Sequence, residues 1–161
     1  MEVRAPGGPT GGHVSDVSFS HFGICVSDLE SSVRFYTEGL GFEVAESHRI
    51  GSEFAALMEL EHVELCSQFI RGHGVSIELL SFSVPEPVGP ASRRPINQLG
   101  LTHLSLRVAD VAATAAAIAA LGGEVVQGTR TTMAFGDTDL EFVYCTDPDG
   151  VRIELMDLGP C

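Results

Sequence analysis

Two histidines and two glutamates occupy matching places in two similar stretches of this 161-residue chain. His21 and His103 each lie near the start of a stretch and are 82 positions apart. Glu78 and Glu154 each lie near its end and are 76 positions apart. Imidazole and carboxylate groups can bind a metal ion or transfer protons if the fold brings them together.

The stretches are an internal duplication. FSHFGICVSDLESSVRFYTEGLGFEV begins at Phe19, and LTHLSLRVADVAATAAAIAALGGEVV begins at Leu101. Each reads as a strand with alternating apolar residues, an aspartate cap and an amphipathic helix that ends at glycine. Three more strands are expected after each helix, over residues 43–50, 62–71 and 75–82 in the first copy and 124–131, 138–146 and 151–158 in the second. The predicted fold class is α+β, with two tandem β-α-β-β-β modules.

Strand alternation assigns a face to each histidine. In the first copy, the apolar residues Phe22, Ile24 and Val26 share one side of the strand, which we expect to lie under the helix. His21 then lies on the opposite, concave side. His103 has the same relation to its own strand.

The glutamates follow the same rule. Glu78 stands between Ile77 and Leu79, and Glu154 has the same apolar pattern around it. Both carboxylates therefore belong to the faces away from the helices. A carboxylate among apolar neighbours is costly unless it is paired or bound to a metal. One such histidine or glutamate could simply be hydrogen-bonded or solvated, but four at repeat-equivalent positions favour a metal site.

The modules are expected to form one domain. We expect a disordered leader at 1–16, the first module at 17–82, a proline-rich linker at 83–100 and the second module at 101–158. Residues 52–60 are predicted to form a short helical insertion in the first module only.

The composition excludes several functions. The net charge is −13, and all nine basic residues are arginine. Without lysine there is no Schiff-base chemistry and no Walker-type phosphate loop. Acidity argues against nucleic acid and anionic membranes as partners. The four cysteines form no CxxC pair, and no apolar run resembles a signal peptide, so a cytoplasmic location is expected.

The span from about residue 19 to 158 resembles the vicinal oxygen chelate superfamily, which includes glyoxalase I, methylmalonyl-CoA epimerase, extradiol dioxygenases and antibiotic-resistance proteins such as bleomycin resistance protein. The matching segments are SHFGICVSDLESSVRFYTEGLGFEV, VSIELLSF, LTHLSLRVADV and TDPDGVRIELMDL. The resemblance implies sheets that curl around one divalent ion (Ni, Zn, Co, Mn or Fe), held by His21, Glu78, His103 and Glu154. This ligand set is closest to that of glyoxalase I. A small-molecule substrate and a homodimer are also implied, with the site built within one chain or across two.

The implied reaction is removal of a proton next to a carbonyl through a metal-stabilised enediolate. Glu154 is the first choice of base and Glu78 is its symmetry mate. This makes the chain a lyase or isomerase. The alternatives are an Fe(II) extradiol-type dioxygenase, a methylmalonyl-CoA-epimerase-like isomerase and a non-catalytic protein that binds a drug.

Two arginines are candidate substrate ligands. Alternation places Arg107 and Arg152 on the faces that carry the ligand residues. Either could bind an anionic substrate group or form an internal salt bridge with a glutamate.

Overall fold

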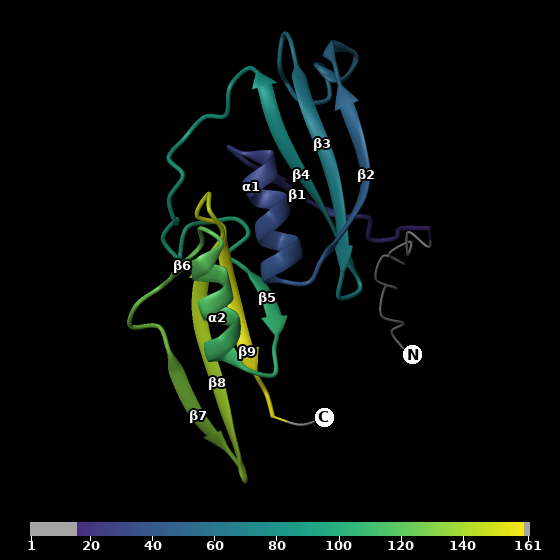
Figure 1. The fold of residues 1–161 in the computed structure, drawn as a ribbon. Coiled ribbons are helices and arrows are strands. Elements are labelled where there is room, and N and C mark those ends of the chain that lie inside the picture. The colour runs from purple at the N-terminus through teal and green to yellow at the C-terminus, as the bar shows by residue number, and fades with distance from the viewer. Residues whose placement is uncertain (1–15, 160–161) are drawn as a thin grey trace, which may run out of the picture.

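The computed structural model describes residues 16–159, so nearly all of the predicted leader lies outside the described range. The first module follows the expected order (Figure 1). Its elements are β1 (Phe22–Cys25), α1 (Leu29–Arg34), a π-helical turn η1 (Phe35–Gly39), β2 (Glu43–Ile50), a 3₁₀ turn η2 (Ser52–Phe54), β3 (Glu64–Gly72) and β4 (Val75–Val84). Only η2 remains of the helical insertion predicted over residues 52–60.

The second module repeats this order with one more strand. Its elements are β5 (Leu104–Arg107), α2 (Val111–Ala120), β6 (Glu124–Val125), β7 (Thr131–Phe135), β8 (Thr138–Thr146) and β9 (Arg152–Asp157). The single strand predicted over residues 124–131 is divided between β6 and β7. A turn separates them, in which the Thr129 N–H donates to the Val126 carbonyl and Gly128 has a φ of 81°. Only glycine adopts such a φ readily.

The two sheets have the same topology. Their strand orders are β1-β4-β3-β2 and β5-β9-β8-β6, and β7 adds to β8 at the edge. The first strand of each module runs parallel to the last, and the other pairs are antiparallel. The predicted α+β class with two mixed sheets is confirmed. No helix within residues 16–159 is long and apolar enough to span a bilayer.

The helices begin where the sequence predicts. Asp28 accepts a hydrogen bond from the Ser31 N–H at 2.8 Å, and Asp110 accepts one from the Ala113 N–H at 2.8 Å. Each cap satisfies one of the backbone donors that a helix N-terminus leaves unpaired. Because each cap follows its strand directly, the helix folds back over the apolar face of its own sheet.

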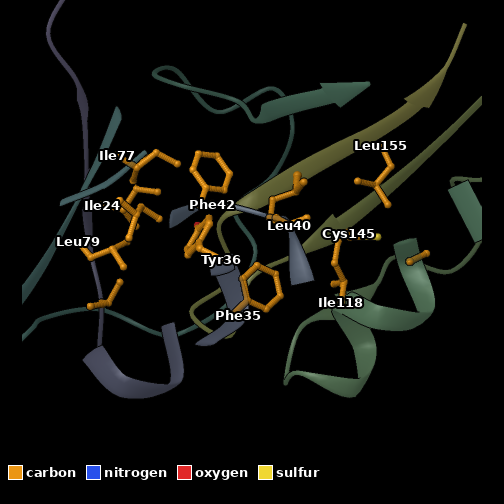
Figure 2. Close-up of a cluster of buried hydrophobic side chains, with 14 of the residues drawn as sticks. Ile24, Phe35, Tyr36, Leu40, Phe42, Ile77, Leu79, Ile118, Cys145 and Leu155 are labelled. Carbon is orange, nitrogen blue, oxygen red and sulfur yellow. The ribbon is translucent and has the colours of Figure 1, made fainter. Parts of the chain in front are cut away.

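One hydrophobic core joins the modules. Phe35 and Tyr36 from η1 are completely buried. Figure 2 shows them with Leu40 between the side chains of the first sheet and those of the second module. On one side lie Ile24, Ile77 and Leu79, and on the other lie Ile118, Cys145 and Leu155. The helices of the two modules thus cover each other as well as their own sheets.

A buried hydrogen bond crosses the same boundary. The Tyr36 hydroxyl donates to Asp147 Oδ2 at 3.0 Å, and the second carboxylate oxygen accepts the N–H groups of Asp149 and Val151. Asp147 is 1% exposed. Burial raises its pKa to about 6 in spite of these hydrogen bonds. The Ser27 N–H adds a second contact across the boundary, to Asp149.

The Asp147→Asn substitution should alter the pH dependence of stability. The folded state holds the proton of Asp147 more tightly than the unfolded chain does. The contribution of Asp147 to the free energy of unfolding is therefore full below about pH 3.8 and is lost as pH rises through about 6. The variant has no such loss. Its free energy of unfolding, measured by urea denaturation, should improve relative to the parent by up to about 3 kcal/mol between pH 4 and 7.

Asp139→Asn, at an exposed position of β8, is the control for removing one carboxylate from the surface. If the Asp147→Asn difference did not change with pH, the Asp147 carboxyl would not titrate with a raised pKa in the folded protein.

Candidate functional site

The first pair of predicted ligands is in contact. His21 immediately precedes β1, and Gly23 of β1 lies opposite Glu78 of β4. His21 Nε2 is 3.2 Å from Glu78 Oε2, with 34% and 19% of these side chains exposed. Ile77 and Leu79 are buried on the other face of β4, as alternation predicts.

The second pair repeats this arrangement. Ser105 of β5 lies opposite Glu154 of β9. His103 Nε2 is 3.4 Å from Glu154 Oε2, with 27% and 19% of the side chains exposed. The duplication therefore holds at the level of side-chain contacts as well as in the sequence.

Hydroxyl groups orient both histidines. The Ser20 hydroxyl lies 2.9 Å from His21 Nδ1, and the Thr102 hydroxyl lies 2.9 Å from His103 Nδ1. An imidazole whose Nδ1–H donates to such an oxygen keeps Nε2 unprotonated and available as a metal ligand. In both modules Nε2 is the atom that faces the glutamate.

Serines also hold the glutamates. The Ser67 hydroxyl donates to Glu78 Oε1, and the Ser105 hydroxyl donates to Glu154 Oε2 at 2.8 Å. These serines lie on β3 and β5, which do not hold equivalent places in the two modules. The two glutamates thus accept similar hydrogen bonds from donors on non-equivalent strands.

An aromatic ring stands beside each histidine. Phe69 lies opposite Glu78 in the sheet and meets the His21 ring at 5.2 Å between centroids. Tyr144 lies opposite Glu154 and meets the His103 ring at 5.5 Å. Neither aromatic residue could be identified from the sequence, because only the strand register makes them neighbours of the glutamates.

These residues form two half-sites. The first half-site consists of Ser20, His21, Ser67, Phe69 and Glu78, and the second consists of Thr102, His103, Ser105, Tyr144 and Glu154. Within residues 16–159 of one chain, no three or more His, Cys, Asp or Glu residues form a group suited to a metal ion. The four predicted ligands therefore lie as two separate pairs, one from each module.

The donor sets fit a divalent metal. Imidazole nitrogen and carboxylate oxygen bind such ions at about 2.1 Å, so two ligands of one ion lie about 3.0–3.4 Å apart. The His–Glu separations of 3.2 and 3.4 Å fall within this range. Each pair is thus spaced to supply two ligands to one ion, with the hydroxyls supporting them.

The two arginines predicted as candidate substrate ligands contact other groups of the protein. Arg152 is 7% exposed, its guanidinium lies 5.1 Å from the Tyr144 ring centroid, and it donates to the Arg94 carbonyl at 2.6 Å. Burial, with the nearby charge of Arg93, lowers the pKa of Arg152. Arg107 donates to the Gly159 carbonyl at 2.5 Å. Arg152 therefore supports the second half-site through Tyr144.

Comparison with known proteins identifies relatives over most of the chain. The family model of the Glyoxalase/Bleomycin resistance protein/Dioxygenase superfamily matches residues 18–155. The chain is 29% identical to a probable chloroplastic lactoylglutathione lyase of Arabidopsis thaliana over 84% of its own length, but it spans only 34% of that protein. It is 27% identical to a 2-epi-5-epi-valiolone epimerase of an Actinomyces species, over 88% of this chain and 80% of the relative.

A solved structure shares the fold. The glyoxalase family protein APC24694 from Bacillus cereus superposes with a TM-score of 0.75 at 18% identity, over 90% of this chain and 98% of that one.

The Ser105→Ala substitution should weaken metal binding. It removes the hydroxyl that holds Glu154, and loss of such a supporting group costs roughly 10- to 100-fold in metal affinity. Competition with a fluorescent Zn²⁺ chelator measures this. Ser83→Ala is the matched control, because the Ser83 hydroxyl on β4 donates to the Glu64 carbonyl outside both half-sites. Equal affinities for Ser105→Ala and the parent would contradict a role for Ser105 in positioning a ligand.

Proposed function

The chain belongs to the glyoxalase/bleomycin resistance protein/dioxygenase superfamily, and on this basis we propose that it is a metal-dependent lyase or isomerase that abstracts a proton next to a carbonyl group. The observation that carries the proposal is the repeated His–Glu pair, with a supporting hydroxyl on each histidine and each glutamate. A purely structural role would not require the same donor set in both modules.

The metal ligands in this proposal are His21, Glu78, His103 and Glu154. They suit one divalent ion such as Ni, Zn, Co, Mn or Fe. When bound, the ion supplies the positive charge that stabilises an oxyanion beside the carbon that loses its proton.

The base in this proposal is Glu154. Glu78 is held at both oxygens, by Ser67 at Oε1 and by His21 at Oε2. The contacts of Glu154 with Ser105 and His103 both fall on Oε2. Glu154 also forms a hydrogen bond with Tyr144, so the choice of Glu154 as the base rests on the resemblance to glyoxalase I, with Glu78 as its symmetry mate.

The Actinomyces relative favours an isomerase variant of this chemistry. An epimerase removes a proton from one face of a carbon and returns it to the other, which takes two bases on opposite sides. Glu78 and Glu154 come from different sheets and would face a substrate from two sides. This variant uses the same four ligands, with Glu78 as the group that returns the proton.

We propose further that a homodimer completes the site. One chain leaves its two half-sites apart, and each is open to solvent. Large apolar side chains are exposed on the second sheet as well, including Met133 at 57% and Phe135 at 76%. A two-fold arrangement that sets the first half-site of one protomer against the second half-site of its partner would build two sites and cover such surface.

Glu154→Gln tests the reaction. Metal-loaded protein should catalyse exchange of the α-proton of 2-hydroxyketones in D₂O, followed by NMR, and the variant should lose about 100-fold or more of this rate. Glu141→Gln is the control, because Glu141 pairs with Arg130 on the other face of β8. Full exchange by Glu154→Gln would exclude Glu154 as the base. Oxygen uptake with catechol by the iron-loaded protein would favour a dioxygenase instead.

Mixing two inactive variants tests the shared site. His21→Ala and His103→Ala should each abolish tight metal binding. After denaturation and refolding together, a mixed dimer has one site with both histidines and one with neither, so about a quarter of all sites should bind metal again. Equilibrium dialysis counts them. If each site lay within one chain, both kinds of chain would be damaged and mixing would restore none.

A further inference from the structure

One buried arginine near the second half-site lacks an acidic partner. Arg152 lies at the start of β9 and is 7% exposed. It donates one hydrogen bond, from Nη2 to the Arg94 carbonyl at 2.6 Å, and its guanidinium lies 5.1 Å from the centroid of the Tyr144 ring. Among the residues that the structure describes, no carboxylate pairs with it. Arginine is rarely buried without a paired acid, so Arg152 is an exception among the buried residues of this chain.

The remaining donors of Arg152 are accessible. A guanidinium has five N–H groups, and the Arg94 carbonyl accepts one of them. Within residues 16–159, Ser32 Oγ is the one fully buried side-chain nitrogen or oxygen atom that lacks a hydrogen bond. Nε and Nη1 of Arg152 have no hydrogen-bond partner there either, so both atoms must reach solvent. The guanidinium thus presents open donors to an incoming group.

The linker supplies a second positive charge. Its backbone lies against the turn before β9, since a Cβ atom added to Gly150 would be 2.4 Å from the Ser92 carbonyl carbon and 2.7 Å from the Arg93 nitrogen. Arg93 is exposed and pairs with no acid in the described part of the chain. Burial and, after it, the nearby charge of Arg93 lower the pKa of Arg152. Two like charges therefore lie close together, and an anion between them would stabilise both.

The two arginines lie near the second half-site. Arg152 and Glu154 share one face of β9, because side chains alternate along a strand, and two residues of a strand span about 6.6 Å. Tyr144 lies opposite Glu154 in the sheet and contacts the Arg152 guanidinium. An anion held by Arg152 would therefore lie within the length of a small molecule from Glu154.

We propose that Arg152 and Arg93 bind an anionic group of the substrate, a carboxylate or a phosphate, which a short chain joins to the carbonyl unit that reacts at Glu154. This inference rests on the proposed function and names its substrate class. A planar guanidinium suits both groups, because its paired N–H donors match two oxygens of a carboxylate or a phosphate. The linker then does more than join the modules, since it brings Arg93 to the site.

Arginine side-chain NMR tests the anion site without metal. The chain has nine arginines and no lysine, so labelling with ¹⁵N-arginine gives at most nine Nε–Hε signals. Propionate and methyl phosphate are added in turn to the metal-free full chain. The signals of Arg93 and Arg152 should shift and reach saturation, and the anion that binds more tightly identifies the preferred group. Equal, unsaturated shifts of all the signals would overturn the inference.

Arg93→Gln supplies the residue-level test. Arg93 is exposed, so the variant should fold, and the loss of its charge should weaken anion binding about tenfold. Arg152→Lys keeps the positive charge but loses the planar donors, and it should also weaken binding. Arg49→Gln is the matched control, because it removes an exposed arginine from β2 in the first module, and it should leave binding unchanged. Binding by Arg93→Gln as tight as that of the parent would contradict the proposed site.

Two metal-chelating hydroxamates test whether the site serves the substrate. The monohydroxamate of succinic acid carries a carboxylate on a short chain, and butyrohydroxamate has an uncharged chain of similar length. On the metal-loaded full chain, isothermal titration calorimetry should show about tenfold tighter binding of the succinic derivative. Arg93→Gln should remove most of this difference and leave butyrohydroxamate unchanged.

The outcomes separate the two proposals. Equal binding of the two hydroxamates would overturn the inference about the substrate and leave the proposed function standing. Saturable binding of propionate or methyl phosphate without binding of either hydroxamate would contradict the proposed function and leave the anion site itself in place.

Discussion

The architecture depends on the buried boundary between the modules. Phe35, Tyr36 and Leu40 pack against both sheets, and the Tyr36–Asp147 hydrogen bond fixes their relative position inside this apolar layer. A buried polar pair of this kind stabilises only the arrangement in which both partners meet. Because each sheet turns its apolar face toward this layer, each His–Glu pair must face outward. The same packing that stabilises the chain therefore keeps its two half-sites apart.

The half-sites are similar in their donors and different in their surroundings. Each has two serine or threonine hydroxyls, an imidazole, a carboxylate and an aromatic ring. In the first module, Ala55 and Leu60 from the segment after η2 cover part of the same face by packing on Leu65 and its neighbours. In the second module, β7 leaves an apolar cavity open beside Glu154. The two modules thus share the groups suited to a metal and differ in the segments around them.

Much of the fold and part of the candidate site could be predicted from the sequence, because strand alternation and helix capping depend on residues that are close together in the chain. Strand β2 at Glu43–Ile50, the two aspartate caps and the faces of His21 and Glu78 follow from neighbours within a few residues. The other residues of the half-sites could not be predicted in this way. The contacts of Phe69, Tyr144 and the two serines that donate to the glutamates depend on which strand pairs with which and in what register. The split between β6 and β7 and the burial of Arg152 against Tyr144 also depend on tertiary packing.

Charge links the composition to the chemistry. With a net charge of −13 and no lysine, the chain has few positively charged side chains available to bind ligands. Arg34, Arg71 and Arg130 are paired with carboxylates, and Arg152 is buried against Tyr144. A divalent ion at the joined half-sites would then be the principal positive charge near the reacting carbon. Negative charge that develops in the substrate would be stabilised where that ion lies, because the surrounding chain is strongly acidic.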